Sequence, residues 1–193
     1  MKLAQVRRRL VSPLADGLSS PLARIGISAD TLTVLGLLAS VSVGLLVYQG
    51  MLVTAGLVFL VAGVFDLLDG ALARRLGQPT RLGALLDSTL DRLGEAAVFL
   101  GILLFFLGEG DDWGAALTLS ALSASSLVSY IKARGDGLGL ACGVGLFTRP
   151  ERVIVIILGL FLDQLLIAVG LITLLSLLTA AQRFLHLRRA ARS

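Results

Sequence analysis

Four aspartates lie where two long apolar stretches meet: Asp66 and Asp69 end the first, and Asp87 and Asp91 begin the second. Residues three or four positions apart share one face of a helix, so each pair is predicted to point in one direction. A short turn around Pro79 separates the stretches, which predicts two antiparallel neighbouring helices whose acid pairs meet at one level. Because four uncompensated carboxylates would repel one another at the edge of a membrane, we expect a cation among them.

The chemistry of these side chains indicates the kind of cation. Carboxylate oxygens suit Mg²⁺ or Mn²⁺, whereas zinc sites use mainly His and Cys, and the only histidine, His186, lies far along the chain. Gly70 and Gly83 leave room for a ligand to come close, and Arg74 can contact an anion. This combination is typical of a site for a diphosphate group, whose oxygens metal ions neutralise. The alternative is that the acids only cap helix ends and pair with nearby arginines: Arg74, Arg75, Arg81 and Arg92.

The helices that hold these acids are predicted to cross a membrane. Of the 193 residues, 56% are hydrophobic, and the mean hydropathy of +0.91 excludes an ordinary soluble domain. We therefore predict an all-α integral membrane protein, with a glycine-rich loop at residues 135–148. The single cysteine, Cys142, excludes an internal disulfide. Six transmembrane helices are expected at residues 31–49, 52–76, 82–107, 114–134, 150–163 and 165–187.

The start of the chain has a different pattern. Residues 1–27 are predicted to form an amphipathic juxtamembrane helix on the membrane surface, and residues 28–193 the six-helix membrane domain. Apolar residues recur at helical spacing from Leu3 to Ile25, with arginines on the other faces. The cluster of three arginines at positions 7–9 is expected to contact membrane lipids, and no nucleic-acid partner is expected.

The distribution of charge predicts the orientation in the membrane. All 17 Lys and Arg residues fall at the end of the predicted helices that also holds both termini. The connections at the opposite end carry only acidic charges, at Glu109, Asp111, Asp112 and Asp163. Because basic residues are retained in the cytosol, both termini and the four aspartates are expected on the cytosolic face of the plasma membrane.

The spacing of the acidic motif resembles the signature of the CDP-alcohol phosphotransferase family. The motif reads Asp66-x2-Asp69-Gly70-x2-Ala73-Arg74-x8-Gly83-x3-Asp87-x3-Asp91. The resemblance implies a six-helix fold, a homodimer, and transfer of a phosphatidyl group from a CDP-linked lipid to an alcohol, with release of CMP. It implies two Mg²⁺ or Mn²⁺ ions, one on Asp66, Asp69 and Asp87, the other on Asp66, Asp87 and Asp91. Asp91 would also be the general base that takes the proton of the attacking hydroxyl.

The same resemblance implies a set of contacts with CDP-diacylglycerol. The matching positions are Asp30, Thr31, Leu32, Thr33, Gly70, Ala73, Arg74, Thr80 and Gly83. From the residues alone, Asp30 and the two threonines that follow it are equally consistent with the N-cap of the first transmembrane helix.

A second polar cluster bears on the alcohol acceptor. Segments SYIKAR, RPER and QR bring basic residues to cytosolic helix ends, as an acceptor with its own phosphate would require. The simpler alternative is that these side chains reach lipid phosphates. The segments resemble phosphatidylinositol-phosphate synthases, which implies inositol 1-phosphate (1D-myo-inositol 3-phosphate) as acceptor. The residues implied to bind its phosphate are Ser129, Lys132, Arg134, Arg152 and Arg183.

Three alternatives stay open from the sequence. Glycerol 3-phosphate or another alcohol could replace the inositol phosphate without a change in chemistry. Intramembrane prenyltransferases also use aspartates and Mg²⁺, but their two motifs lie far apart in longer chains. A non-enzymatic divalent-cation-binding membrane protein, such as a carrier, should continue its acids across the bilayer, and here the acids stay near the helix ends.

Overall fold

A computed structural model describes residues 28–75 and 80–192. In this part of the chain all regular structure is helical, which confirms the all-α prediction. The predicted amphipathic helix at residues 1–27 lies outside the described residues. The six helices are α2 (Ala29–Tyr48), α3 (Leu52–Arg75), α4 (Arg81–Gly108), α5 (Asp112–Gly137), α6 (Arg149–Phe161) and α7 (Leu165–Ala190).

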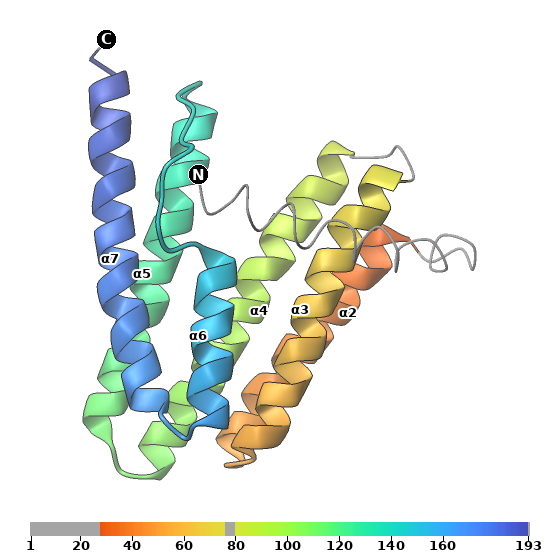
Figure 1. Ribbon diagram of the computed structural model, residues 1–193, viewed down its shortest axis with the longest axis vertical. Helices are drawn as coiled ribbons and strands as arrows, with labels where there is room; N and C mark the ends of the chain where they lie inside the picture. The colour runs from red at the N-terminus through yellow and green to blue at the C-terminus, as the bar shows by residue number, and fades with distance from the viewer. Residues whose placement is uncertain (1–27, 76–79, 193) are drawn as a thin grey trace.

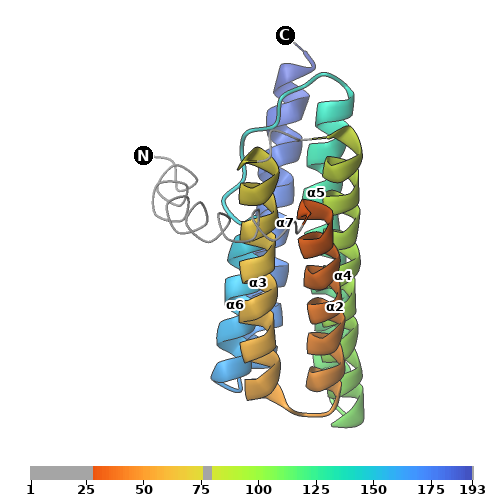
Figure 2. The same ribbon diagram turned by 90° about the vertical axis from the view of Figure 1, so that its right-hand side faces the viewer.

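The six helices form a closed ring (Figures 1 and 2). Going round it, α2 packs on α4, α4 on α5, α5 on α7, α7 on α6, α6 on α3, and α3 on α2. The prediction that α3 and α4 are direct neighbours is therefore wrong, because α2 packs against both of them. The connections α2–α3, α4–α5 and α6–α7 lie together at the bottom of Figure 1, opposite the C-terminus.

Close contact between α2 and α4 depends on glycine. A Cβ atom on Gly101 would lie 2.1 Å from the carbonyl oxygen of Gly44, and one on Gly44 would lie 2.4 Å from the carbonyl oxygen of Ala97. No side chain fits at these distances, so the two backbones touch. Val43, Val47, Val98, Phe99 and Ile102, all nearly inaccessible, pack around this contact. The α2–α4 pair is thus a rigid support for the residues at its polar end.

The outer surface of the ring is apolar, as a lipid-facing surface requires. Leu38 and Leu45 of α2, Leu57 of α3 and Leu174 of α7 are more than half exposed. Four of the described helices, α2, α3, α5 and α7, are long and apolar enough to cross a membrane. Helix α4 has 28 residues but carries Asp91, Arg92 and Glu95, and α6 has only 13 residues.

The helix ends differ from the predicted ones in two informative places. Ser28, and neither Asp30 nor a threonine, is the N-cap of α2, because its side chain accepts a hydrogen bond from the Thr31 amide at 3.1 Å. Helix α5 continues to Gly137, so the glycine-rich loop is shorter than the predicted 135–148. The cap explanation for the Asp30 segment therefore does not account for Asp30 itself.

Candidate active site

Three of the four aspartates form one group. Asp66 and Asp69 on α3 and Asp87 on α4 each offer a carboxylate oxygen, and these oxygens lie within 4.8 Å of one another. Asp69 is buried, and its Oδ2 atom accepts a hydrogen bond from Thr33 Oγ1 on α2 at 3.0 Å. The predicted meeting of acids from the two helices is thus confirmed. Helix α2 packs against both α3 and α4 and so supports the acids of both helices from one side.

The fourth aspartate, Asp91, lies outside that group and has an arginine partner. Arg149, the first residue of α6, places Nη1 2.9 Å from Asp91 Oδ1 and 2.5 Å from Asp66 Oδ1. The cation expected among the acids is therefore partly supplied by the chain itself, from a helix that sequence reasoning had not connected with them. No local pattern signals this contact, because Arg149 and Asp66 are 83 positions apart.

The acids suit a divalent cation. Arg149 pairs with Asp66 and Asp91, whereas the group that could hold an ion consists of Asp66, Asp69 and Asp87. Its ligand atoms are carboxylate oxygens, which Mg²⁺ and Mn²⁺ prefer. Neither Cys142 nor His186 belongs to the group.

A cavity of about 440 Å³ opens beside the acids. Its polar end is formed by Thr33, Asp66, Asp69, Asp91 and Arg149. The other walls come from apolar residues of α2, α3 and α6, including Leu37, Phe59, Leu60, Val153 and Ile157. A ligand with a charged head and a hydrocarbon tail matches this division.

The positions predicted to contact a CDP-linked lipid lie around the same end of the ring. Thr80 caps α4 by accepting from the Gly83 amide at 2.9 Å. A Cβ atom on Gly83 would lie 3.4 Å from Asp30 Oδ1, so the starts of α2 and α4 are close. Thr33 contacts Asp69, and Leu32 is buried with Leu68 and Leu72 of α3. Gly70 and Ala73 are partly buried on α3, and Thr31 and Arg74 are exposed.

The predicted acceptor residues separate into two groups. Arg152 and Ser129 join one partly buried network through Arg92 and Glu95, neither of which was predicted to belong to the acceptor site. Glu95 pairs with Arg152 Nε at 2.6 Å and with Arg92 Nη1 at 3.2 Å, and Arg92 Nη1 also donates to Ser129 Oγ. An acid within an apolar run, one turn after Asp91, was the available signal for Glu95.

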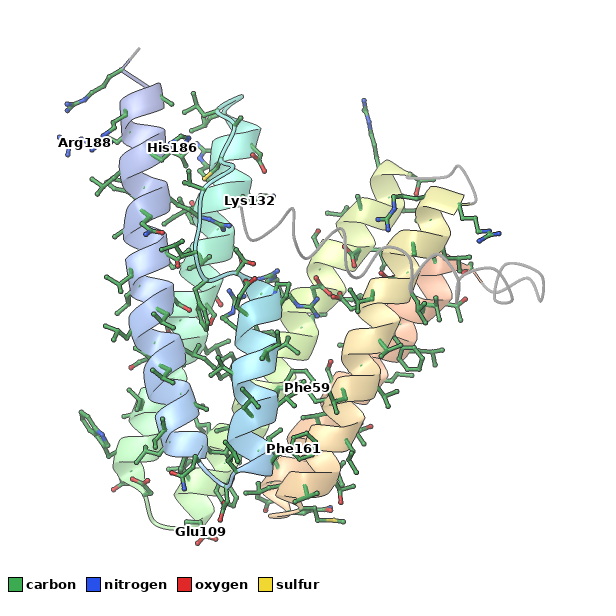
Figure 3. All side chains as sticks on the ribbon, in the orientation of Figure 1. Phe59, Glu109, Lys132, Phe161, His186 and Arg188 are labelled. Carbon is green, nitrogen blue, oxygen red and sulfur yellow. The ribbon has the colours of Figure 1, made fainter. Side chains whose placement is uncertain are left out.

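The remaining predicted acceptor residues have other surroundings. Arg183 is buried and donates to the carbonyl oxygens of Val144 (2.9 Å) and Val128 (2.7 Å), with no carboxylate partner among the described residues. Lys132, labelled in Figure 3, lies 3.6 Å from Asp136, and both side chains are about half exposed. Arg134 is exposed. Of these three, only Arg183 is placed inside the ring.

The fold and the site define a class: helical membrane proteins with an acidic divalent-cation site beside an apolar cavity. The sequence profile of the CDP-alcohol phosphatidyltransferases matches residues 27–182, and the chain belongs to this family. It is accordingly an enzyme of the CDP-alcohol phosphotransferase type.

Relatives in this family have more specific names. The chain is 38% identical to archaetidylinositol phosphate synthase of Methanothermobacter thermautotrophicus, over 80% of this chain and 73% of the relative. It is 36% identical to phosphatidylinositol phosphate synthase of Mycobacteroides abscessus, over 91% of this chain and 84% of the relative.

Solved structures of the Mycobacterium tuberculosis phosphatidylinositol phosphate synthase have the same fold. One, with CDP-DAG bound, has a TM-score of 0.79 at 36% identity and covers 93% of this chain and 94% of its own. Another, in complex with manganese and citrate, has a TM-score of 0.80 at 36% identity and covers 92% of this chain and 88% of its own. The overlap extends over nearly the whole chain, so the family fold accounts for all six helices.

Proposed function

We propose that this protein transfers a phosphatidyl group from CDP-diacylglycerol to a hydroxyl of inositol 1-phosphate (1D-myo-inositol 3-phosphate). The products are phosphatidylinositol phosphate and CMP. The observation that carries the proposal is the group of carboxylates on Asp66, Asp69 and Asp87, two of which, Asp66 and Asp69, line the polar end of a cavity with apolar walls. That combination suits a lipid whose head is a diphosphate.

The aspartates have separate proposed roles. Asp66, Asp69 and Asp87 hold one Mg²⁺ or Mn²⁺ ion, and Asp66, Asp87 and Asp91 a second. Bound divalent ions supply charge neutralisation at the phosphoryl oxygens and the CMP leaving group. Asp91 takes the proton from the attacking hydroxyl, and its place in the cavity wall beside Arg149 is consistent with contact to a substrate. The relative solved in complex with manganese and citrate supports a divalent ion.

The donor lipid is proposed to lie along the cavity between α2, α3 and α6. Its acyl chains contact the apolar walls, and its diphosphate contacts the acidic end. Its head group is proposed to contact the starts of α2 and α4 and the end of α3. The residues are Asp30, Thr31, Leu32, Thr33, Gly70, Ala73, Arg74, Thr80 and Gly83. The relative solved with CDP-DAG bound supports this choice of donor.

The acceptor is proposed to be anionic because arginines gather on the inner side of the ring. Three arginines lie within ion-pair distance of carboxylates on α4: Arg92, Arg149 and Arg152. Among the described residues, Arg183 donates hydrogen bonds only to backbone carbonyl oxygens. A phosphate is a strong acceptor of hydrogen bonds from such groups. Ser129, Lys132 and Arg134 complete the proposed phosphate site. The names of the relatives favour inositol phosphate over glycerol 3-phosphate.

The arrangement in the membrane belongs to the same proposal. All six helices cross or enter the bilayer, with residues 1–27 as an interfacial helix and residues 28–193 as the membrane domain. The termini and the acids face the cytosol at the plasma membrane, since the far connections carry no basic residue. A homodimer is proposed from the resemblance to the family.

The test is CMP release by the purified protein with Mg²⁺ and CDP-diacylglycerol. Inositol 1-phosphate, inositol, glycerol 3-phosphate and serine are supplied separately as acceptors. Release with inositol 1-phosphate alone is expected, and EDTA should abolish it. Release with glycerol 3-phosphate alone would keep the chemistry and reject the acceptor. No release with any acceptor, with or without EDTA, would contradict the proposed function.

A further inference from the structure

Two ion pairs cross the interior of the ring between α4 and α6, which are not neighbours in it. Asp91 and Glu95 are four residues apart on α4, and Arg149 and Arg152 are three apart at the start of α6, so each pair shares a helix face. Asp91 pairs with Arg149 at 2.9 Å, and Glu95 pairs with Arg152 at 2.6 Å. The first pair belongs to the proposed catalytic site. In the second pair, Arg152 belongs to the proposed phosphate site, and only Glu95 has no role in the chemistry described above.

Glu95 lies at the centre of a network that joins three helices. Its Oε1 atom accepts from Arg152 Nε at 2.6 Å, and its Oε2 atom accepts from Arg152 Nη2 at 3.1 Å and from Arg92 Nη1 at 3.2 Å. Arg92 Nη1 also donates to Ser129 Oγ on α5. A two-point contact with a planar guanidinium group fixes its position and its rotation.

The network leaves one donor of Arg152 without a partner in the described part of the chain and leaves Arg92 accessible from solution. Arg152 is 1% exposed, and its Nη1 atom has no hydrogen-bond partner among the described residues. The Arg92 side chain is 37% exposed, so solutes can reach it. Arg152 is therefore the fixed inner part of the network and Arg92 the accessible part. A buried guanidinium nitrogen without a partner is costly, which indicates a ligand or a function.

We propose that Glu95 is a positioning residue of the acceptor site. It holds Arg152 and Arg92 in one arrangement beside Ser129, so that the phosphate of the acceptor meets donors that are already in place. This inference rests on the proposed transfer to a phosphorylated alcohol. It assigns to Glu95 no contact with the reacting atoms.

The direction of the change in acceptor binding separates positioning by Glu95 from a simple charge effect. Arg92 and Arg152 carry two positive charges and Glu95 carries one negative charge, so the network has a net charge of +1. Glu95→Gln raises that charge and would strengthen anion binding if charge alone mattered. If Glu95 acts by positioning, the same variant weakens binding of the acceptor, because the arginines repel each other and lose their fixed orientation.

The experiment measures the KM of each substrate and kcat for wild type and Glu95→Gln with CDP-diacylglycerol and inositol 1-phosphate. We expect the acceptor KM to rise about tenfold or more, while the KM of CDP-diacylglycerol changes less than about twofold. Glu109→Gln is the matched control, because it makes the same change at the exposed far end of α4 (Figure 3). It should leave both KM values unchanged.

Three further variants keep the test decisive: Glu95→Asp, Arg152→Gln and the double variant of Glu95→Gln with Arg152→Gln. Glu95→Asp retains the charge but withdraws the carboxylate by one methylene, and should raise the acceptor KM in the same direction by a smaller factor. It replaces the Gln variant where that protein does not fold. The double variant Glu95→Gln with Arg152→Gln should show a smaller KM rise than the product of the two single effects, because Glu95 acts through Arg152.

The outcomes that overturn the proposal are distinct from a failure of the proposed function. An unchanged or lower acceptor KM in the Glu95 variants excludes positioning. A parallel rise in both KM values with a lower melting temperature assigns Glu95 to structure alone. The inference is also rejected if the rise in acceptor KM in the double variant equals the product of the rises in the Glu95→Gln and Arg152→Gln variants. Absence of CMP release by the wild type concerns the function and not Glu95.

Discussion

At the scale of single residues, the four aspartates divide into a group of three and one that stands apart. Asp66, Asp69 and Asp87 share a space that a single ion can span, and Asp91 lies outside that group. Arg149 pairs with both Asp91 and Asp66. The acids of one motif therefore have different surroundings. The difference predicts that the acids respond differently to substitution.

The first residue-scale prediction compares Asp91→Asn with Asp66→Asn. Asp91→Asn should lower turnover about 100- to 10,000-fold through loss of the base while it retains most binding of CDP-diacylglycerol. Asp66→Asn should weaken both, because Asp66 belongs to the three-acid group. Turnover and equilibrium binding of the lipid measure the two effects. An equal loss of lipid binding in both variants would reject Asp91 as the base.

The second residue-scale prediction concerns Arg149→Gln. Arg149 is the basic partner of both Asp66 and Asp91, so its loss removes the ion-pair partner of both carboxylates. We expect the variant in EDTA to lose about 1–3 kcal/mol of stability, and Mn²⁺ to restore part of the loss. Thermal unfolding in detergent with and without Mn²⁺ measures this, and Arg188→Gln near the end of α7 is the control. Equal melting temperatures of the wild type and Arg149→Gln in EDTA would contradict this prediction.

At the scale of elements, helix α2 has a larger part than its own few polar residues indicate. It packs against both α3 and α4, which carry the acids, and Thr33 contributes a hydrogen bond to Asp69. The distance between the carboxylates therefore depends on how closely α2 approaches α4. Gly44 and Gly101 set that approach.

The element-scale prediction is that Gly101→Ala reduces both stability and turnover. The new methyl group would lie 2.1 Å from the backbone of Gly44, so the helices must move apart. Overpacking of this kind costs about 1–3 kcal/mol or more. Gly108→Ala, on the same helix with nothing within 4 Å of a new Cβ atom, is the control. Melting temperature and CMP release test the pair; an active Gly101→Ala protein of wild-type stability would reject the role of this contact.

At the scale of the whole molecule, charge divides the helix ring into two ends. Glu109 and Arg188, labelled in Figure 3, lie at opposite ends of the bundle. The end with Arg188 also holds the acids and the proposed acceptor site. The asymmetry is a property of the entire chain, because each connection contributes to it.

The whole-molecule prediction uses cysteine labelling of intact cells in a Cys142→Ala background, since Cys142 is the only cysteine. A membrane-impermeant maleimide should label Glu109→Cys and should label Arg188→Cys only after the membrane is opened. The two positions are exposed, so access depends on the side of the membrane. Labelling in the reverse order would contradict the orientation.

The sequence by itself determined the helical class, the approximate helix bounds and the chemistry of the acidic motif. These features are local: apolar runs predict helices, and residues three or four positions apart on a helix share one face. The tertiary structure alone decided that α2 packs against both α3 and α4, that Arg149 joins Asp66 and Asp91, and that Glu95 holds Arg152. Those ion-pair partners are 57 or more positions apart. No periodicity reaches so far, because such contacts arise only when the ring of helices closes.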